Sequence, residues 1–434
     1  MVKNQDLRSP GVSYPSIDYE NFWDWFVQVS DIEYHWKHEP TYLISQFAFL
    51  LGGLLTFIHA LIKRQRFIYL WIGILLHGLV VEMMSYWVPD IDNFWHSQTP
   101  IIFLGQRLPL HIIFLYPCFL YQASVAVSKL KLPLWAEPFA VGLCTVLVDI
   151  PYDIISVNFL HWTWHDTDPN IYDRHYWVPW NSYYFHACFA ASFTFWFHFF
   201  RRRMCSNKDG GKWEASTMWK EILCTLFASL LGTPGGILMF IPIYHPLHDV
   251  YKLHSEVTFF ILFAIFLLII WSGDRKAQRN NNDIKPKTFK STFLLILHLI
   301  VHYTSFLIMP IFFKPEDEIA VGLKEPVGPC DKIVPVQTVF GVLKKRQFLC
   351  VSDYDEKYFD FHCIPKEQIP PHGSHWYTAC GVPLQNQVEM IAIVSLICVI
   401  ACCVFWNLHF NSFGDEAIAT KLKATKVSTQ KKKK

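Results

Sequence analysis

Charged side chains are scarce in this chain. Asp, Glu, Lys and Arg make up 17% of its 434 residues, whereas soluble domains contain about a quarter. The net charge is only +2, so no global field favours nucleic acid, and no nucleic-acid partner is predicted. Residues 1–41 contain no short apolar core, so no cleavable signal peptide is predicted. The sequence also shows no internal repeat and no soluble enzymatic domain. The fold must therefore be inferred from its apolar stretches.

Long apolar stretches account for most of the chain. A helix needs about 20 apolar residues to cross the hydrocarbon core. On this criterion we predict nine transmembrane helices and an all-α, polytopic bundle, with the first helix acting as the insertion signal. The predicted helices cover residues 42–62, 67–88, 101–128, 138–157, 178–200, 221–243, 254–272, 291–313 and 390–410.

Basic residues alternate between the connections of these helices. Lys and Arg collect after the first, third, fifth and seventh helices and in the tail, whereas the other connections hold few. Because basic connections stay in the cytosol, we predict a lumenal N-terminus and a cytosolic C-terminus. The predicted regions are a lumenal segment (1–41), an eight-helix membrane domain (42–313), a lumenal loop (314–389), the ninth helix (390–410) and a cytosolic basic tail (411–434).

The lumenal loop contains four of the chain's 12 cysteines: Cys330, Cys350, Cys363 and Cys380. An even set of cysteines in an oxidising compartment indicates disulfide bonds. Four cysteines allow three pairings, and the sequence does not choose among them. The alternative is four unpaired thiols in a loose loop.

The chain ends in four lysines, Lys431 to Lys434. Lys431 and Lys432 stand fourth and third from the end and resemble a dilysine retrieval signal, which binds coat machinery and returns proteins to the endoplasmic reticulum. The alternative is a solvated basic tail that contacts anionic lipid. We therefore expect a multi-pass protein of the endoplasmic reticulum membrane.

Ionisable residues gather at the lumenal half of the predicted helices, where they are expensive and usually face a cavity or one another. Asp149 and Asp153 lie one turn apart on one helix face, and Glu82 lies near the end of another helix. Paired carboxylates in an apolar pocket repel, so one can keep a proton near neutral pH. We expect these three residues to be the catalytic acid–base set.

Other polar and aromatic residues of the same half are expected to bind substrate. Trp162 and Trp164 are placed at the mouth, where their rings can stabilise a developing cation. Arg107 is a binding candidate, but it can instead form a structural pair with Asp149 or Asp153. The full set of predicted binding residues is Arg107, His111, Trp162, Trp164, Asn181 and His186.

The alternative interpretation of the lumenal polar cluster is a metal site, although no cofactor is predicted. Histidines are numerous enough to hold a divalent metal together with carboxylates. However, the sequence has no HExxH pattern and no histidine boxes of the hydroxylase or desaturase type. The weak metal candidates are His161, His165, His245 and His248, and each can equally be a structural residue of a wet loop.

Thr233-Pro234-Gly235-Gly236 predicts a break in the sixth helix. Broken helices are tolerated in a membrane only where protein or water satisfies the backbone. Such a break fits a substrate cavity, and it fits the hinge of a transporter equally well.

The stretch 145–186 resembles the signature region of membrane carotenoid biosynthesis proteins of the carotenoid-hydratase type. The matches are Asp149, Asp153, Trp162, Trp164, Tyr176, Val178-Pro179 and Asn181, with Glu82, Phe94 and Leu108-Pro109 upstream. The chain departs from the pattern at Ile154 and Trp177, where the family has Pro and Gly. The resemblance covers about residues 70–200, and it implies an isoprenoid-like substrate and proton-driven chemistry at a double bond.

These observations favour a membrane enzyme that acts on an apolar lipid at a lumenal pocket. The expected partners are membrane lipid and an apolar small-molecule substrate. The first alternative is a transporter of lipids or small molecules, in which the polar groups form a path. The second alternative is a receptor or assembly factor that works through residues 314–389.

Overall fold

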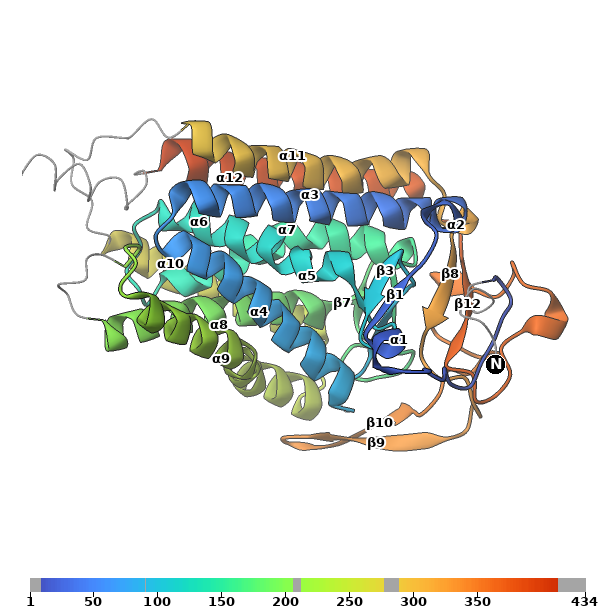
Figure 1. Cartoon of the computed structure of the whole chain (residues 1–434). Helices are drawn as coiled ribbons and strands as arrows, with labels where there is room; N and C mark the ends of the chain where they lie inside the picture. The colour runs from blue at the N-terminus through green and yellow to red at the C-terminus, as the bar shows by residue number, and fades with distance from the viewer. Residues whose placement is uncertain (1–8, 90, 206–211, 277–288, 413–434) are drawn as a thin grey trace, which may run out of the picture.

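The computed structural model describes residues 9–89, 91–205, 212–276 and 289–412. Long helices pack side by side, and small sheets lie at one end of the bundle (Figure 1). Residues 314–389 form two of these sheets and are called the cap. The long helices are α3 (Pro40–Lys63), α4 (Arg66–Trp87), α7 (Glu137–Asn158), α8 (Trp180–Met204), α9 (Met218–His245), α10 (Ser255–Arg275), α11 (Phe289–Phe312) and α12 (Gln387–Trp406).

A further helical stretch runs through the centre of the bundle without interruption. It consists of α5 (Leu110–Tyr116), a π-helical turn η2 (Pro117–Tyr121) and α6 (Gln122–Ser128). Similar π turns, η4 (Pro246–Val250) and η7 (Asn407–Asn411), extend α9 and α12. Pro117 and Pro246 lack the backbone N–H that a regular helix needs, and the wider turns begin at these residues.

Among the described residues, eight helical stretches are long and apolar enough to cross a membrane. They correspond to the predicted helices except 178–200, whose counterpart is α8. α8 has 25 residues, as long as its neighbours, but it carries Asn181, His186 and a basic last turn. It packs between α7 and α9. The chain is therefore a helical membrane protein, with α8 as the polar member of the bundle.

The described parts of the connections lie at two opposite ends of the bundle. At one end, Lys212 pairs with Glu137 at 2.7 Å and Lys129 donates to His409. At the other end, the backbones of Tyr14 and Trp376 pair beside the cap. The N-terminal segment thus lies at the cap end, and the end of η7 lies at the opposite end (Figure 1).

The predicted third helix begins nine residues too early. Residues 101–109 form β3 (Ile101–Phe103) and β4 (Leu108–Pro109), and β3 also pairs with β1 (Val27–Val29). The turn between them has positive φ at residues 104, 105 and 106, a conformation that no right-handed helix contains. Gln106 and Arg107 therefore precede the helix and lie at the edge of the cap.

The predicted break in the sixth helix is wrong, because α9 runs from Met218 to His245 with Pro234 inside it. The two glycines allow α8 to approach closely instead. A Cβ at Gly235 would lie 2.3 Å from Ser192 Oγ, and one at Gly236 would lie 2.3 Å from Phe189 Cδ1.

The predicted all-α class needs a correction in the 314–389 loop, which is an ordered, β-containing cap. One sheet has the strand order β11 (Phe359–Asp360), β12 (Trp376–Gly381) and β8 (Ile319–Leu323). A hairpin of β9 (Ile333–Thr338) and β10 (Gly341–Arg346) extends under α9 (Figure 1). All four predicted cysteines form disulfides, as Cys330–Cys350 and Cys363–Cys380. Lys431, Lys432 and part of the 273–290 connection lie outside the described residues.

Candidate functional site

A cavity of about 320 Å³ opens inside the bundle toward the cap. This volume lies at the lower end of the range of small-molecule sites. α4, α5, η2, α7, α8 and α9 form its walls, and β2 (Phe94–His96), β5 (Trp162–Trp164) and β9 form its mouth. Most lining side chains are aliphatic or aromatic. The ionisable residues that line it are His77, Glu82, His96, Tyr116, Tyr152, His186 and His245.

Two helices present facing pairs of polar side chains at the wall of this cavity. Asp149 and Asp153 lie one turn apart on α7, and Ser182 and His186 lie one turn apart on α8. Ser182 Oγ donates to Asp153 Oδ2 at 2.7 Å, and His186 Nε2 lies 3.4 Å from Asp149 Oδ1. Both aspartates are fully buried, whereas Ser182 and His186 line the cavity. The aspartates therefore reach the cavity through these two partners.

Three of the four aspartate oxygens are buried and accept no hydrogen bond from a donor group of the other described residues, while the two carboxyl groups contact each other. They are Asp149 Oδ1, Asp149 Oδ2 and Asp153 Oδ1. Buried polar atoms are almost always paired, and a buried charge without a partner is costly. Two adjacent carboxylates in an apolar interior therefore need either a shared proton or a cation.

Glu82 faces the same cavity from α4 and is held by aromatic hydroxyls. Tyr86 and Tyr116 donate to its two oxygens at 2.6 and 2.7 Å, and His96 Nε2 lies 3.8 Å away. Tyr116 also interacts electrostatically with both Asp149 and Asp153. The site thus contains two acidic groups. Both oxygens of Glu82 accept hydrogen bonds, whereas most oxygens of the Asp149–Asp153 pair accept none from other described residues.

The predicted binding residues divide into two groups. Trp162 and Trp164 line the cavity at its mouth, where β5 pairs with β2. Arg107, His111 and Asn181 lie outside the cavity lining that the described residues form. The indole Nε1 atoms of both tryptophans are buried and have no hydrogen-bond partner in the described part of the chain. His186 is the remaining predicted binding residue that reaches the cavity.

Arg107 and Asn181 have structural partners instead. Arg107 donates to Asp92 at 2.6 Å and stacks on the Tyr86 ring, so the alternative pairing with Asp149 or Asp153 is wrong. Asn181 donates to the carbonyl of Asn170 and anchors the loop that precedes α8. His111 is buried against the rings of Tyr42 and Phe49.

The four weak metal candidates do not converge on one point. His161 stacks on Tyr42 and hydrogen-bonds to Ser156 and Thr41 at 3.0 Å each. Burial lowers the pKa of His161 to about 3, so its ring is neutral. His165 contacts Glu325 at 3.0 Å. His245 and His248 share Asp249, at 2.8 and 2.9 Å, and only His245 lines the cavity.

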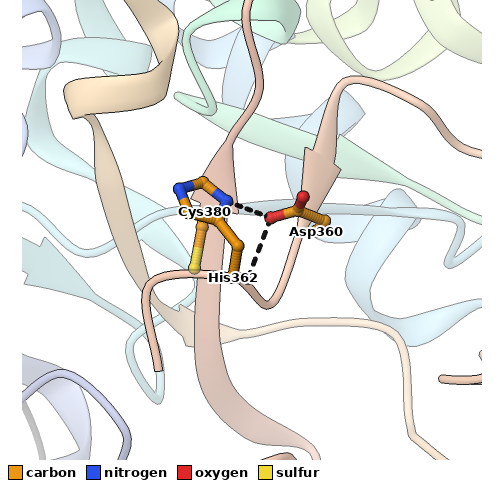
Figure 2. A group of neighbouring side chains, drawn as sticks. All are labelled: Asp360, His362 and Cys380. Carbon is orange, nitrogen blue, oxygen red and sulfur yellow. Dashed lines mark hydrogen bonds and ion pairs between the residues drawn. The ribbon is translucent and has the colours of Figure 1, made fainter. Parts of the chain in front are cut away.

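A second cluster with donor atoms for a metal lies in the cap (Figure 2). The ring and backbone N–H of His362 both contact one Asp360 oxygen, beside the sulfur of Cys380. However, Cys380 is bonded to Cys363. A disulfide sulfur is not the thiolate that binds metals, and we therefore assign this cluster a structural role.

The cap contributes to the cavity wall, which the sequence does not predict. Val336 and Gln337 of β9 line it, although they lie more than 130 residues from the end of α8 in the chain. Ser182 was also missed, and its spacing of four residues before His186 was the signal that could have found it.

Buried charges hold the cap against the loop between α7 and α8. Arg174 pairs with Glu356 at 2.5 Å, and Lys345 pairs with Asp168 at 3.2 Å. Asp166 accepts from the backbone N–H of Asp355 at 2.8 Å. The cap is therefore a fixed part of the cavity wall.

The sequence comparisons give one family match. The family model described as a domain of unknown function (DUF7802) matches residues 12–410. No curated protein and no solved structure matches the chain. The matched region covers more than nine-tenths of the chain, and the chain therefore belongs to the DUF7802 family.

Proposed function

We propose that this protein is an integral membrane enzyme that acts on an apolar lipid, isoprenoid-like or acyl, inside the central cavity. One observation carries the proposal: the carboxyl groups of Asp149 and Asp153 contact each other, and three of their four buried oxygens accept no hydrogen bond from a donor group of the other described residues, beside a cavity with mostly apolar walls. Unsatisfied buried groups are costly, and they are retained at sites that use them.

The geometry supports proton transfer to and from a hydrocarbon chain. In this scheme the Asp149–Asp153 pair holds one proton and passes it through Ser182 or His186, which line the cavity, to a carbon of a double bond; a C–H bond forms and a carbocation is left. Glu82, on the opposite wall, then takes a proton from an adjacent carbon or from the water that adds to the cation. The first route moves the double bond and the second forms an alcohol, and both balance without an oxidant.

The mouth of the cavity supports the same chemistry. The rings of Trp162 and Tyr152 lie 4.9 Å apart, and both line the cavity. Aromatic faces attract cations, an effect worth about 2 kcal/mol in a desolvated site. The faces of these rings can therefore stabilise a carbocation that forms between them and the facing helices.

We place the cap in the lumen of the endoplasmic reticulum. The two disulfides of the cap fit an oxidising compartment, and the connections at the opposite end carry the basic residues that favour the cytosol. Lys431 and Lys432 support retrieval to this membrane through coat machinery. The continuous α9 removes the hinge on which the transporter alternative partly rested.

A lipid profile of cells that lack the protein tests the proposal. Cells are complemented with wild type, with Asp153→Asn, or with Glu256→Gln as a matched control, since Glu256 is half exposed on α10. We expect the wild type and Glu256→Gln to restore the profile, and Asp153→Asn to leave substrate accumulated. Full restoration by Asp153→Asn, at equal protein level, would contradict the acid–base role.

A further inference from the structure

We infer that Asp149, Asp153, Ser182 and His186 form a binding site for one divalent cation. The carboxylate and imidazole ligand atoms of Asp149, Asp153 and His186 all lie within 4.8 Å of one another. The hydroxyl of Ser182 adds a fourth donor, 2.7 Å from Asp153 Oδ2. The site differs from the histidine candidates that the sequence indicated.

The two helices are spaced for coordination by side chains from both. Each contributes two donors one helical turn apart, and the two pairs face each other across the contact of α7 and α8. Ligands about 2.0–2.2 Å from an ion lie within about 4.4 Å of one another. A small rotation of one carboxylate therefore closes the site around an ion.

The charge of the site favours a divalent cation. Two carboxylates that both lose their protons carry two negative charges in a water-poor interior, and one divalent ion balances these charges. Within the described ranges no donor group of another residue hydrogen-bonds to Asp149 Oδ1, Asp149 Oδ2 or Asp153 Oδ1, and the two carboxyl groups contact each other there; an ion can take the place of the proton that they share. Both aspartates have 0% exposure, which distinguishes this group from ordinary acidic clusters on a surface.

The donor set narrows the choice of metal. Two carboxylates and one imidazole suit Zn²⁺, Mn²⁺ or Fe²⁺, whereas Mg²⁺ and Ca²⁺ prefer oxygen donors alone. His186 and Ser182 line the cavity, so a vacant coordination position would face the substrate. An ion there would replace the proton that the two aspartates otherwise share, and a water molecule bound to the ion would then be the proton donor to the substrate. This consequence for catalysis rests on the proposed function.

Metal analysis of the intact protein tests the site directly. The full-length protein is purified in detergent without chelator, incubated in turn with Zn²⁺, Mn²⁺ and Fe²⁺, desalted, and analysed by mass spectrometry of its elements. We expect about one ion per chain in the wild type and in Glu82→Gln, whose acid lies outside the cluster. We expect at least tenfold weaker retention in Asp149→Asn and His186→Ala.

Two results would overturn the inference: a wild type that retains none of the three ions, or a double variant Asp149→Asn/Asp153→Asn that retains the ion as well as the wild type does. Where these variants lose their thermal unfolding transition, the milder Ser182→Ala provides the test, through faster loss of the ion to a chelator. An ion-free wild type whose Asp153→Asn variant still fails to restore the lipid profile would end this inference and leave the proposed function standing. An ion bound to the wild type, together with a normal lipid profile in Asp153→Asn, would support the metal site and contradict the proposed function.

Discussion

Replacing Arg174 with Met should weaken the docking of the cap on the bundle, and the loss of docking free energy should depend on pH. The Arg174 side chain is 9% exposed and that of its partner Glu356 is 3% exposed. Arg174 donates to Glu356 at 2.5 Å and to the carbonyls of His165 and Trp177 at 2.8 and 3.2 Å. Removing one partner of a buried ion pair typically costs about 3–5 kcal/mol.

The protonation of Glu356 sets the pH dependence. Burial raises the pKa of Glu356 to about 8, from an ordinary value of 4.5, although Arg174 opposes the rise. The stabilising contribution of this carboxyl is therefore complete below pH 4.5 and is lost as the pH rises through 8. Without Arg174 the pKa rises further, so the Arg174→Met variant loses stability over a wider pH range than the wild type does.

The free-energy cost of Arg174→Met depends on whether Glu356 is protonated or ionised. At pH 6 Glu356 holds a proton, and Arg174→Met removes only hydrogen bonds, at about 1–3 kcal/mol. At pH 9 the wild-type carboxylate is ionised and paired, and the same substitution costs about 3–5 kcal/mol. A factor of ten in an equilibrium constant corresponds to about 1.4 kcal/mol. At pH 9 the cap should therefore open at least two orders of magnitude more often.

Hydrogen exchange of amides that cross the interface measures this opening. The N–H groups of Asp355, Arg346 and Asp166 donate to partners across it, each at 2.8 Å. The double variant Arg174→Met/Glu356→Met removes both charges and should exchange nearly as slowly as the wild type. Equal effects of Arg174→Met at pH 6 and pH 9, or a double variant as fast as the single one, would refute the reasoning.

Two further predictions concern the cap and the bundle. Replacing both cysteines of Cys330–Cys350 with Ser should lower the unfolding free energy of the cap by about 3 kcal/mol, because the bond closes a loop with a sequence separation of 20; an unchanged denaturation midpoint in the absence of reductant would contradict this. Gly236→Ala should destabilise the bundle by about 1–3 kcal/mol, because its Cβ would collide with Phe189. Gly341→Ala, whose Cβ meets nothing within 4 Å, is the matched control, and equal midpoints for the two variants in thermal unfolding would argue against close packing of α8 on α9.

Long apolar windows predict the positions of the long helices well. The predicted ranges 42–62 and 138–157 compare with α3 at Pro40–Lys63 and α7 at Glu137–Asn158. The start of the third helix was wrong because the apolar run Ile101–Leu104 does not distinguish a buried strand from a helix. The break at Pro234 was wrong because tertiary packing overrides the local signal of Pro and Gly in α9.

The site was predictable where helical spacing determines position. Asp149 and Asp153 share a face because they lie four residues apart, and the same spacing joins Ser182 to His186. The placement of Arg107 was not predictable, because its partner Asp92 lies on a loop whose path no periodic pattern describes. The approach of Val336 to the cavity was likewise hidden, since it depends on how a disulfide-bonded cap docks against distant residues.

The buried charges between the cap and the bundle also impose an order on biosynthesis. Arg174 leaves the ribosome 182 residues before Glu356, an interval of roughly 10–40 s at ordinary rates of synthesis. Helices α8, α9, α10 and α11 are made in that interval, while Arg174 and Asp168 lack their cap partners. The cap therefore completes the mouth of the cavity only after most helices of the bundle have been synthesised. Substitutions in the cap should for this reason reduce the yield of assembled protein, even where they touch no group that faces the cavity.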